Sequence, residues 1–489
     1  MLKLLNWLKE RILFIGVVVL LVFIPLYPKF PLFEVPGTYV AIRFEDFLVA
    51  FLVGVFILKT LGERTNIFQD RLNRLIFAYF VVGGLSSLSA IMITKNVIPH
   101  LVLLHWVRRI EYMLLFFIAA ASVRKMQDVK DYLVAIFLAT AGVIIYGLGQ
   151  KFLGFPVIST MNEEFSKGVL LSLSEWARVN STFAGHYDLA AYLVLVLAVT
   201  VGGIIGFASF WQKIFTLIFG IFTFYLLILT ASQISFIAYL VGITAVLVFS
   251  KKYFWIIPVL SLSILAIFTS SEFSQRYATT LKINLSFLSG IYKSKGKEKL
   301  VLLPTPTPPP PPSVVAPLKP KRKVISLPTP TPTPIEKKYV YYGPTEPTEP
   351  IELTAYRSVK IRFNVEWPRA IRAFKKNPLL GTGYSSITLA TDNDYLRALG
   401  ETGILGFVAL LLIFLEIARR VFEFLPRNGL GLEKAVVIGI SGAALGFLIN
   451  AFFIDVFEAS KVAFVFWILV GIMVGVINIS MTTRMVKNE

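Results

Sequence analysis

The sequence contains no cysteine and only 3 histidines among its 489 residues. The first absence excludes disulfides and thiolate metal sites, and the second leaves few ligands for zinc. Charged residues are also scarce, at 16% against about 25% in an ordinary soluble domain. We therefore expect no metal centre and no cofactor, and a chain that cannot hide its apolar surface in water.

Hydrophobic residues are abundant and make up 56% of the chain. They form repeated runs of roughly 17 to 25 residues, the length that crosses a hydrocarbon core about 30 Å thick as a helix. The 48 Lys and Arg exceed the 29 Asp and Glu, but they are scattered between the apolar runs. This pattern favours membrane-flanking charges over nucleic-acid binding. The fold class we predict is an all-α, polytopic integral membrane protein.

The apolar runs predict about twelve spans. Short basic stretches occur at every second junction, such as the one with Arg64 after the second span and the one with Lys251 after the eighth. Because Lys and Arg concentrate in cytoplasmic loops, both termini should be cytoplasmic and segments 151–185 and 271–400 should lie outside a bacterial cytoplasmic membrane. The predicted spans are 12–27, 38–59, 75–94, 99–122, 130–150, 186–208, 211–230, 232–250, 254–270, 402–419, 434–454 and 460–480.

The first span allows two interpretations. Basic residues such as Lys3 and Arg11, followed by an apolar stretch, resemble a signal peptide, but the sequence after Pro25 offers no cleavage site with small residues. We therefore favour a retained first helix. Cleavage would leave the topology of the rest unchanged.

The domain organisation follows from the one long hydrophilic stretch. Residues 1–270 hold the first nine spans and residues 402–489 the last three. The extracytoplasmic loop between them starts at 271–303 and ends in a helical part at 351–401. Its middle, 304–350, is rich in Thr-Pro repeats and cannot bury a core, so we predict a disordered, extended tether. A solvated spacer is favoured over a specific binding site.

The fourth predicted span contains charged residues at bilayer depth. Its first half includes His105, Arg108, Arg109 and Glu111, and the apolar part after them is too short to cross alone. A central Arg costs about 2.5 to 3.5 kcal/mol on insertion scales, so both arginines must face protein or water. An internal ion pair of Glu111 with Arg108 is one explanation. Because one Glu cannot neutralise two Arg, we favour anion binding.

Further polar residues fall at the outer ends of their spans. Arg178 and His186 precede the sixth span, Gln233 begins the eighth, and Asp455 follows the eleventh. Because all of these residues are predicted on the outer side of the membrane, a site formed by them would open outward beneath the long loop.

The segment that follows the tether is basic and is predicted to be helical over residues 356–376. Arg362 and Arg369 are seven residues apart and share a face. Phosphate binding and a solvated or lipid-facing role remain equal alternatives for this face.

Three blocks together resemble the family of O-antigen ligases and O-antigen polymerases, which are bacterial membrane glycosyltransferases. The first block is Arg178-Val-Asn-Ser-Thr-Phe-Ala-Gly-His-Tyr-Asp-Leu-Ala-Ala-Tyr-Leu, and the second is Leu229-Thr-Ala-Ser-Gln-Ile-Ser. The third runs from Arg362 through Asn377-Pro-Leu-Leu-Gly-Thr-Gly and Asp392-Asn-Asp-Tyr-Leu-Arg to Phe407. Their order, the number of spans and the large loop between the second and third blocks strengthen the resemblance.

The resemblance implies a metal-independent, inverting transfer of a glycan from an undecaprenyl-pyrophosphate carrier to an acceptor hydroxyl at the outer face of the membrane. Arg178 and Arg362 match the family's pyrophosphate-binding arginines. To these we add Arg108, Arg109 and Arg369 as donor-site candidates from the residues themselves. A guanidinium fork binds phosphate bidentately and stays protonated in a poorly hydrated site.

Two positions depart from the family pattern. Gln233 replaces a usual Arg, and Asp392 stands where the ligases carry the His that is thought to activate the acceptor. An Asp can act as general base, especially when burial raises its pKa. Asp392 and His186 are therefore the two candidates for the catalytic base.

Several functional alternatives fit the sequence. The acceptor can be a lipid-linked glycan, as in a polymerase, or a lipid, protein or wall component, as in a ligase. A transporter or flippase for an anionic lipid-linked substrate would use the same arginines but predicts paired broken helices in both halves. An inactive scaffold of the same family is the third possibility. Membrane lipids are expected partners in every case.

Overall fold

The computed structural model describes residues 2–28, 30–35, 41–95, 97–157, 173, 177–267, 361–387, 390–426 and 431–488. These residues belong to one unit, which comprises Met1–Thr280 and Gly343–Glu489. The predicted loop start at 271–303 and the predicted tether at 304–350 lie outside the described residues, as does the beginning of the helical part at 351–401.

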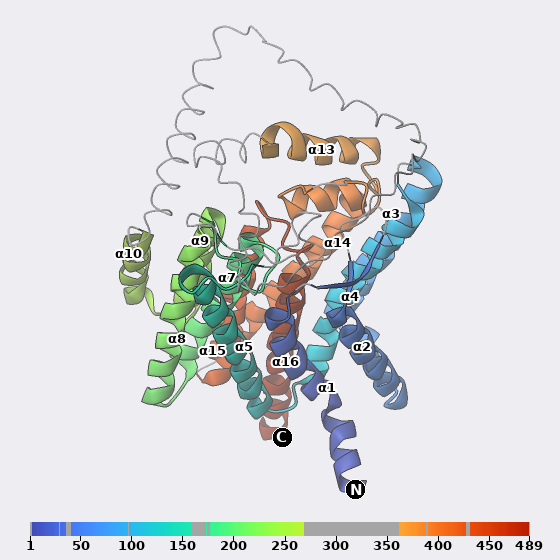
Figure 1. The fold of residues 1–489 in the computed structure, drawn as a ribbon. Coiled ribbons are helices and arrows are strands. Elements are labelled where there is room, and N and C mark those ends of the chain that lie inside the picture. Colours follow the sequence, from blue (N-terminus) through green and yellow to red (C-terminus); the bar gives the residue numbers. More distant parts are fainter. Residues whose placement is uncertain are drawn as a thin grey trace, which may run out of the picture. The chain divides into compact units, whose positions relative to one another are not determined.

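Helices dominate the part of the chain that the structure describes, which confirms the predicted class (Figure 1). A two-stranded antiparallel hairpin of β1 (Pro31–Glu34) and β2 (Ala41–Arg43) accompanies them. The principal helices are α1 (Leu2–Leu26), α2 (Phe44–Gly62), α3 (Arg71–Ser89), α4 (Pro99–Ser122), α5 (Met126–Phe152), α7 (His186–Gly206), α8 (Phe210–Leu229), α9 (Gln233–Phe249), α10 (Ile256–Ile267), α13 (Trp367–Lys376), α14 (Asp394–Phe424), α15 (Leu432–Asn450) and α16 (Ser460–Asn488). Short helical turns are η1 (Ile67–Gln69), η2 (Ala90–Thr94), η3 (Tyr253–Trp255) and η4 (Arg362–Glu366), of which η2 and η4 are π-helical.

Each predicted span overlaps a helix, but only some of these helices qualify as spans by length and composition. Among the described residues 7 helices are long and apolar enough to cross a membrane. They cover Arg71–Thr94, Met126–Phe152, His186–Gly206, Phe210–Leu229, Asp394–Phe424, Leu432–Asn450 and Ser460–Met481. The chain is thus a membrane protein, while the number twelve stays a prediction.

The predicted second span begins too early. Residues 41–43 form strand β2, and α2 starts only at Phe44. The Arg43 amide donates to the Asp46 carboxylate at 2.9 Å, a contact that fixes the start of the helix. The hydropathy pattern could not reveal this boundary because Ala41 and Ile42 are apolar.

Small residues bring the central helices together. A Cβ on Gly202 of α7 would lie 2.7 Å from the Ala435 carbonyl oxygen of α15, and one on Gly242 of α9 would lie 2.8 Å from that of Gly442. Such close approach lets helices associate through dispersion contacts where no water drives them together. The helices α7, α15 and α16 are accordingly the most buried of the bundle.

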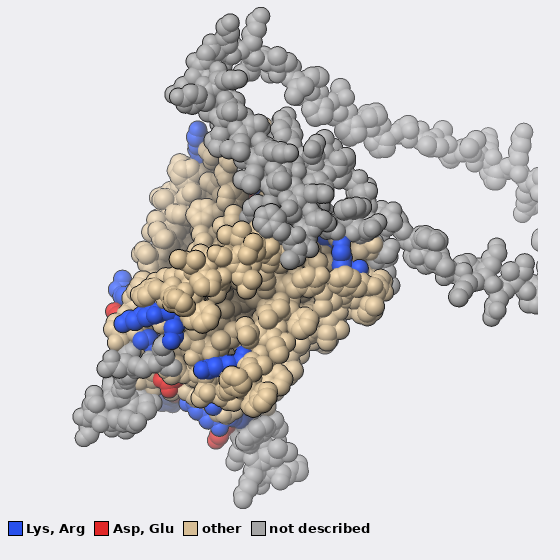
Figure 2. Space-filling view, turned by 90° about the vertical axis from the view of Figure 1, so that its left-hand side faces the viewer, with Lys and Arg blue, Asp and Glu red and all other residues tan. Residues whose placement is uncertain are grey.

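The outer helices expose apolar side chains instead. Leu58 of α2 is 73% exposed and Phe215 of α8 is 69% exposed. Figure 2 shows the side on which α8 and α10 lie, with a broad uncharged area and Lys and Arg gathered in a few groups. A soluble protein rarely exposes so continuous an apolar surface, whereas lipid tails cover it without cost.

The loop after α13 docks into a break in α14. Gly403 has a φ of +65°, a backbone conformation that favours glycine. At this break the Ile404 amide donates to the Pro378 carbonyl at 2.9 Å, and the Gly383 amide donates to the Glu401 carbonyl at 2.8 Å. These bonds hold α13 across the ends of the long helices, opposite the two chain termini (Figure 1). We call this end of the bundle the loop end.

Candidate functional site

The first sequence block forms a buried loop that is fixed by hydrogen bonds to α5 and α1. The Ser181 amide donates to Gln150 Oε1 at 2.7 Å, and Gln150 Nε2 donates back to the Ser181 carbonyl at 3.0 Å. Thr182 Oγ1 donates to the Pro25 carbonyl at 2.6 Å. The loop therefore presents Arg178 and the start of α7 from a rigid support.

Lys461 of α16 is a second support of this loop that sequence reasoning missed. It is only 1% exposed, and its ammonium donates to the carbonyls of Thr182 at 2.8 Å and Pro25 at 3.2 Å. It also lies 4.8 Å from the centre of the Phe183 ring. A lysine at the predicted outer end of a span contradicts the charge rule, and this was the available signal.

Arg178 lies beside two aromatic residues at the start of α7. Its Nη1 forms a hydrogen bond with His186 Nε2, and its guanidinium carbon lies 5.9 Å from the centre of the Tyr187 ring. The rings of His186 and Tyr187 are 4.1 Å apart. Since an arginine only donates, His186 Nε2 accepts here and is occupied.

Arg362, on η4, binds Asp392 with two nitrogens. Nε lies 2.9 Å and Nη2 lies 2.7 Å from the same carboxylate oxygen, Oδ2. Tyr187 interacts electrostatically with Arg362 and with Arg178. The two arginines that match the family motif thus approach each other across Tyr187, although 183 positions and several helices separate them in the sequence.

Asp392 lies in a turn that is held in place by Asp455 and Arg397. Its φ is +48°, a conformation that Asp tolerates better than most residues. Asp455 accepts from the amides on both sides of it, from Thr391 at 2.8 Å and from Asn393 at 3.2 Å. Arg397 in turn donates to Asp455 at 3.1 Å. The turn is held from outside, so the Asp392 side chain can point at Arg362.

Carboxyl groups at this site hold their protons more tightly than usual. Burial raises the pKa of Asp392 above its ordinary value, although Arg362 acts in the opposite direction. Burial, and then the neighbouring Asp392 carboxylate, raises the pKa of Glu366 to about 7. Sequence reasoning missed Glu366, whose signal was its position one turn after Arg362.

Several buried polar atoms near Glu366 have no hydrogen-bond partner within the described ranges. They are Glu366 Oε2, Trp367 Nε1 and Arg369 Nη1, all on η4 and α13. Buried polar groups are otherwise paired in folded proteins, and each exception calls for an explanation. A ligand that supplies both donors and acceptors, as a glycosyl pyrophosphate does, is one such explanation.

The two arginines of α4 have protein partners. Arg108 donates to both oxygens of Asp46, at 3.2 and 3.0 Å, and to the Ala41 carbonyl at 2.8 Å. Arg109 donates to the Phe457 carbonyl at 2.7 Å and pairs with Glu458. These contacts favour the internal ion-pair explanation over direct anion binding, with Asp46 as partner of Arg108 where Glu111 was expected.

The second sequence block joins the first block to α15. The Val179 amide donates to the Leu229 carbonyl at 3.4 Å, and Ser235 Oγ donates to Asn450 Oδ1 at 3.0 Å. All three blocks therefore meet at the loop end. Among the described residues no group of three or more His, Asp or Glu is arranged to hold a metal ion.

Comparison with known proteins agrees with this arrangement. Residues 217–411 match the family model described as O-antigen ligase. The match extends from α8 into α14 and includes the second and third blocks, and it confirms the resemblance. This part of the chain is thus similar to the O-antigen ligase family, whose members are membrane enzymes of the glycosyltransferase type in polysaccharide biosynthesis. None of the curated proteins matches the chain.

Proposed function

We propose that this protein transfers a glycan from an undecaprenyl-pyrophosphate carrier to an acceptor hydroxyl, without a metal, at the outer face of a bacterial cytoplasmic membrane. The observation that carries the proposal is the approach of Arg178 and Arg362 across Tyr187, next to the Asp392 carboxylate. Two fixed cations beside carboxyl groups of raised pKa are what pyrophosphate departure with base catalysis requires.

Arg178 and Arg362 bind the pyrophosphate in this proposal. Asp392 neutralises Arg362 while the site is empty. When the donor binds, its phosphate oxygens take the place of Asp392 at the guanidinium group. Loss of this cation raises the proton affinity of Asp392 further, so donor binding itself prepares the base.

The transfer is a single displacement. A carboxylate of Asp392 or Glu366 accepts the proton of the acceptor hydroxyl, and the acceptor oxygen attacks the anomeric carbon. The bond to the carrier oxygen breaks, and its electron pair leaves with the pyrophosphate, where the arginines stabilise the charge. Attack opposite the leaving group inverts the anomeric configuration.

Other polar and charged residues hold the site in shape. His186 orients Arg178, while Arg108 and Arg109 fix the loop-end segments through Asp46 and Glu458. Arg369, with a nitrogen lacking a partner in the described chain, contacts the donor in this proposal.

Reconstitution with a synthetic undecaprenyl-pyrophosphate oligosaccharide tests the proposal. The expected result is release of the carrier together with glycan transfer. Transfer to a lipid-linked glycan would identify a polymerase, whereas transfer to a lipid, protein or wall component would identify a ligase. Movement of the donor across the bilayer without transfer would favour the flippase and overturn the proposed activity.

The sidedness has a direct test because the chain lacks cysteine. Arg372→Cys on α13 and Lys252→Cys between α9 and η3 each place one thiol at an exposed position. A membrane-impermeant maleimide should label the first in intact cells and the second only after permeabilisation. The reverse pattern would overturn the proposed topology while leaving the chemistry open.

A further inference from the structure

A cavity of about 390 Å³ lies at the end of the bundle opposite the loop end. Residues from α1, α2, α3, α4 and α16 line it, which places it between the ends of five elements. Its volume falls within the range of small-ligand sites, about 300 to 1,000 Å³. Nothing in the proposed transfer reaction uses it.

Two cations face this cavity, and in the described part of the chain only Lys59 has a carboxylate close to it. Lys59 and Arg124 both line it and repel each other. Glu63 lies 3.9 Å from Lys59 but has a 56% exposed side chain, and Asp70 is already bound by Arg420. Within the described residues, no carboxylate lies within 4.0 Å of the Arg124 guanidinium. An anion placed between the two cations would relieve their repulsion.

The rest of the lining combines polar side chains, such as Thr60 and Asn73, with apolar walls that face the lipid side of α2. Leu13, Phe56 and Phe116 supply apolar walls. On α2, the neighbours of Lys59 point outward, with Leu58 73% exposed and Leu61 70% exposed. A ligand that fits this surface carries a phosphate at one end and hydrocarbon at the other.

We infer that this cavity binds the phosphate headgroup of an anionic membrane lipid, held between Lys59 and Arg124, with an acyl chain along the exposed face of α2. Basic pockets between helices near a membrane surface suit such headgroups. The lipid joins α2 to α4, which both line the cavity, and it does this independently of the glycan donor.

The test measures lipid retention by the full-length protein in nanodiscs of phosphatidylcholine with and without phosphatidylglycerol. Native mass spectrometry of the released protein should show bound phosphatidylglycerol, and its presence should raise the unfolding temperature. Lys59→Gln/Arg124→Gln should weaken retention about tenfold or more, because charge-assisted hydrogen bonds to the phosphate are lost. Arg124→Gln alone, at an exposed side chain, provides a milder variant if the double variant folds poorly.

Lys125→Gln/Lys130→Gln is the matched control, since it removes two exposed basic residues near the same end that do not line the cavity. Equal loss of lipid in this control and in the cavity variant would reduce the effect to general surface charge and overturn the inference. Stabilisation by inorganic phosphate in pure phosphatidylcholine discs, as strong as that by the anionic lipid, would assign the site to free phosphate and overturn the lipid.

Discussion

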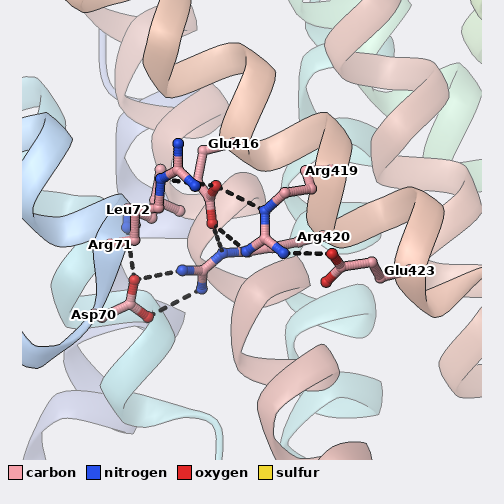
Figure 3. A network of polar contacts seen from close by, with 7 residues as sticks. All are labelled: Asp70, Arg71, Leu72, Glu416, Arg419, Arg420 and Glu423. Carbon is pink, nitrogen blue, oxygen red and sulfur yellow. Dashed lines mark hydrogen bonds and ion pairs between the residues drawn. The ribbon is translucent and has the colours of Figure 1, made fainter.

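Two charged clusters, one at each end of the bundle, differ in how completely their groups are paired. The cluster that joins α3 to α14 contains Asp70, Glu416 and Arg420 (Figure 3). Arg420 binds both oxygens of Asp70 and donates to Glu416 at 3.0 Å, while Arg419 donates to both oxygens of Glu416 at 2.9 and 2.7 Å. At the loop end, by contrast, Glu366 and Arg369 bury polar atoms without partners in the described chain.

The pKa values of the carboxyl groups also differ between the two clusters. Burial acts to raise the pKa of Asp70, but the hydrogen bonds and charge of Arg420 and the Leu72 amide outweigh it and lower the pKa. Burial is not outweighed at Asp392 and Glu366, whose pKa values are raised. A saturated network holds helices together, whereas a cluster with spare partners and protonatable carboxyls is prepared for a ligand.

The largest expected effect comes from Arg362. Arg362→Ala should lower the rate of glycan transfer about 10³-fold, as removal of one stabilising donor does in other enzymes. The measurement is transfer from the synthetic donor by reconstituted protein. Arg372→Ala, which removes an exposed arginine of α13, is the control and should keep full activity. Equal rates for both variants would exclude Arg362 from the donor site.

Glu366 should have the next largest effect. Its pKa of about 7 implies that the wild-type rate falls as the pH drops below about 7, because only the ionised carboxylate accepts a proton. Glu366→Gln should lower the rate about hundredfold and remove that inflection, within the usual range for general bases. A pH profile of the transfer rate between 5 and 9 measures both. An unchanged inflection in the variant would assign it to Asp392 instead.

The helices could be predicted from the sequence, whereas most contacts within the loop-end cluster could not. The helices could be predicted because an apolar run of span length has few alternatives in a bilayer. A shared role of Arg178 and Arg362 could be predicted only from the resemblance to the family motifs, and the place of Tyr187 between them was not visible in the sequence. In the sequence, Tyr187 does not differ from any other tyrosine near the start of a helix. Only the fold brings η4 beside α7.

Residues that hold the site were the hardest to predict. Lys461 acts through two backbone carbonyls from distant segments, and no residue spacing encodes such contacts. Gly403 was predicted only as part of a span, and no contact between it and the loop after α13 was predicted. Their mutual hydrogen bonds depend on a helix break that hydropathy does not detect, because the residues on both sides of it are apolar.

Glu416 tests the structural cluster. Its side chain is 1% exposed and accepts from two arginines, so Glu416→Gln should destabilise the protein by about 2 kcal/mol, because both arginines lose their hydrogen bonds to a buried carboxylate. Unfolding in detergent, followed by circular dichroism, measures this loss. The transfer rate of the folded fraction should stay the same, and a large drop in that rate would contradict the separation of the two clusters.

The smallest effect is expected at Asp70, and it depends on pH. Because Arg420 keeps the folded-state pKa of Asp70 below its unfolded value of about 3.9, the ion pair contributes stability above that pH and loses it as the pH falls through the folded-state value. Asp70→Asn retains the helix cap to Leu72, so it should cost only about 1 kcal/mol at pH 7, and the difference from wild type should shrink toward pH 3. Unfolding of both proteins at several pH values measures this, with the exposed Glu63→Gln as control. A difference that stays the same between pH 7 and pH 3 would mean that the charge of Asp70 does not contribute to stability, and would remove it from the saturated network.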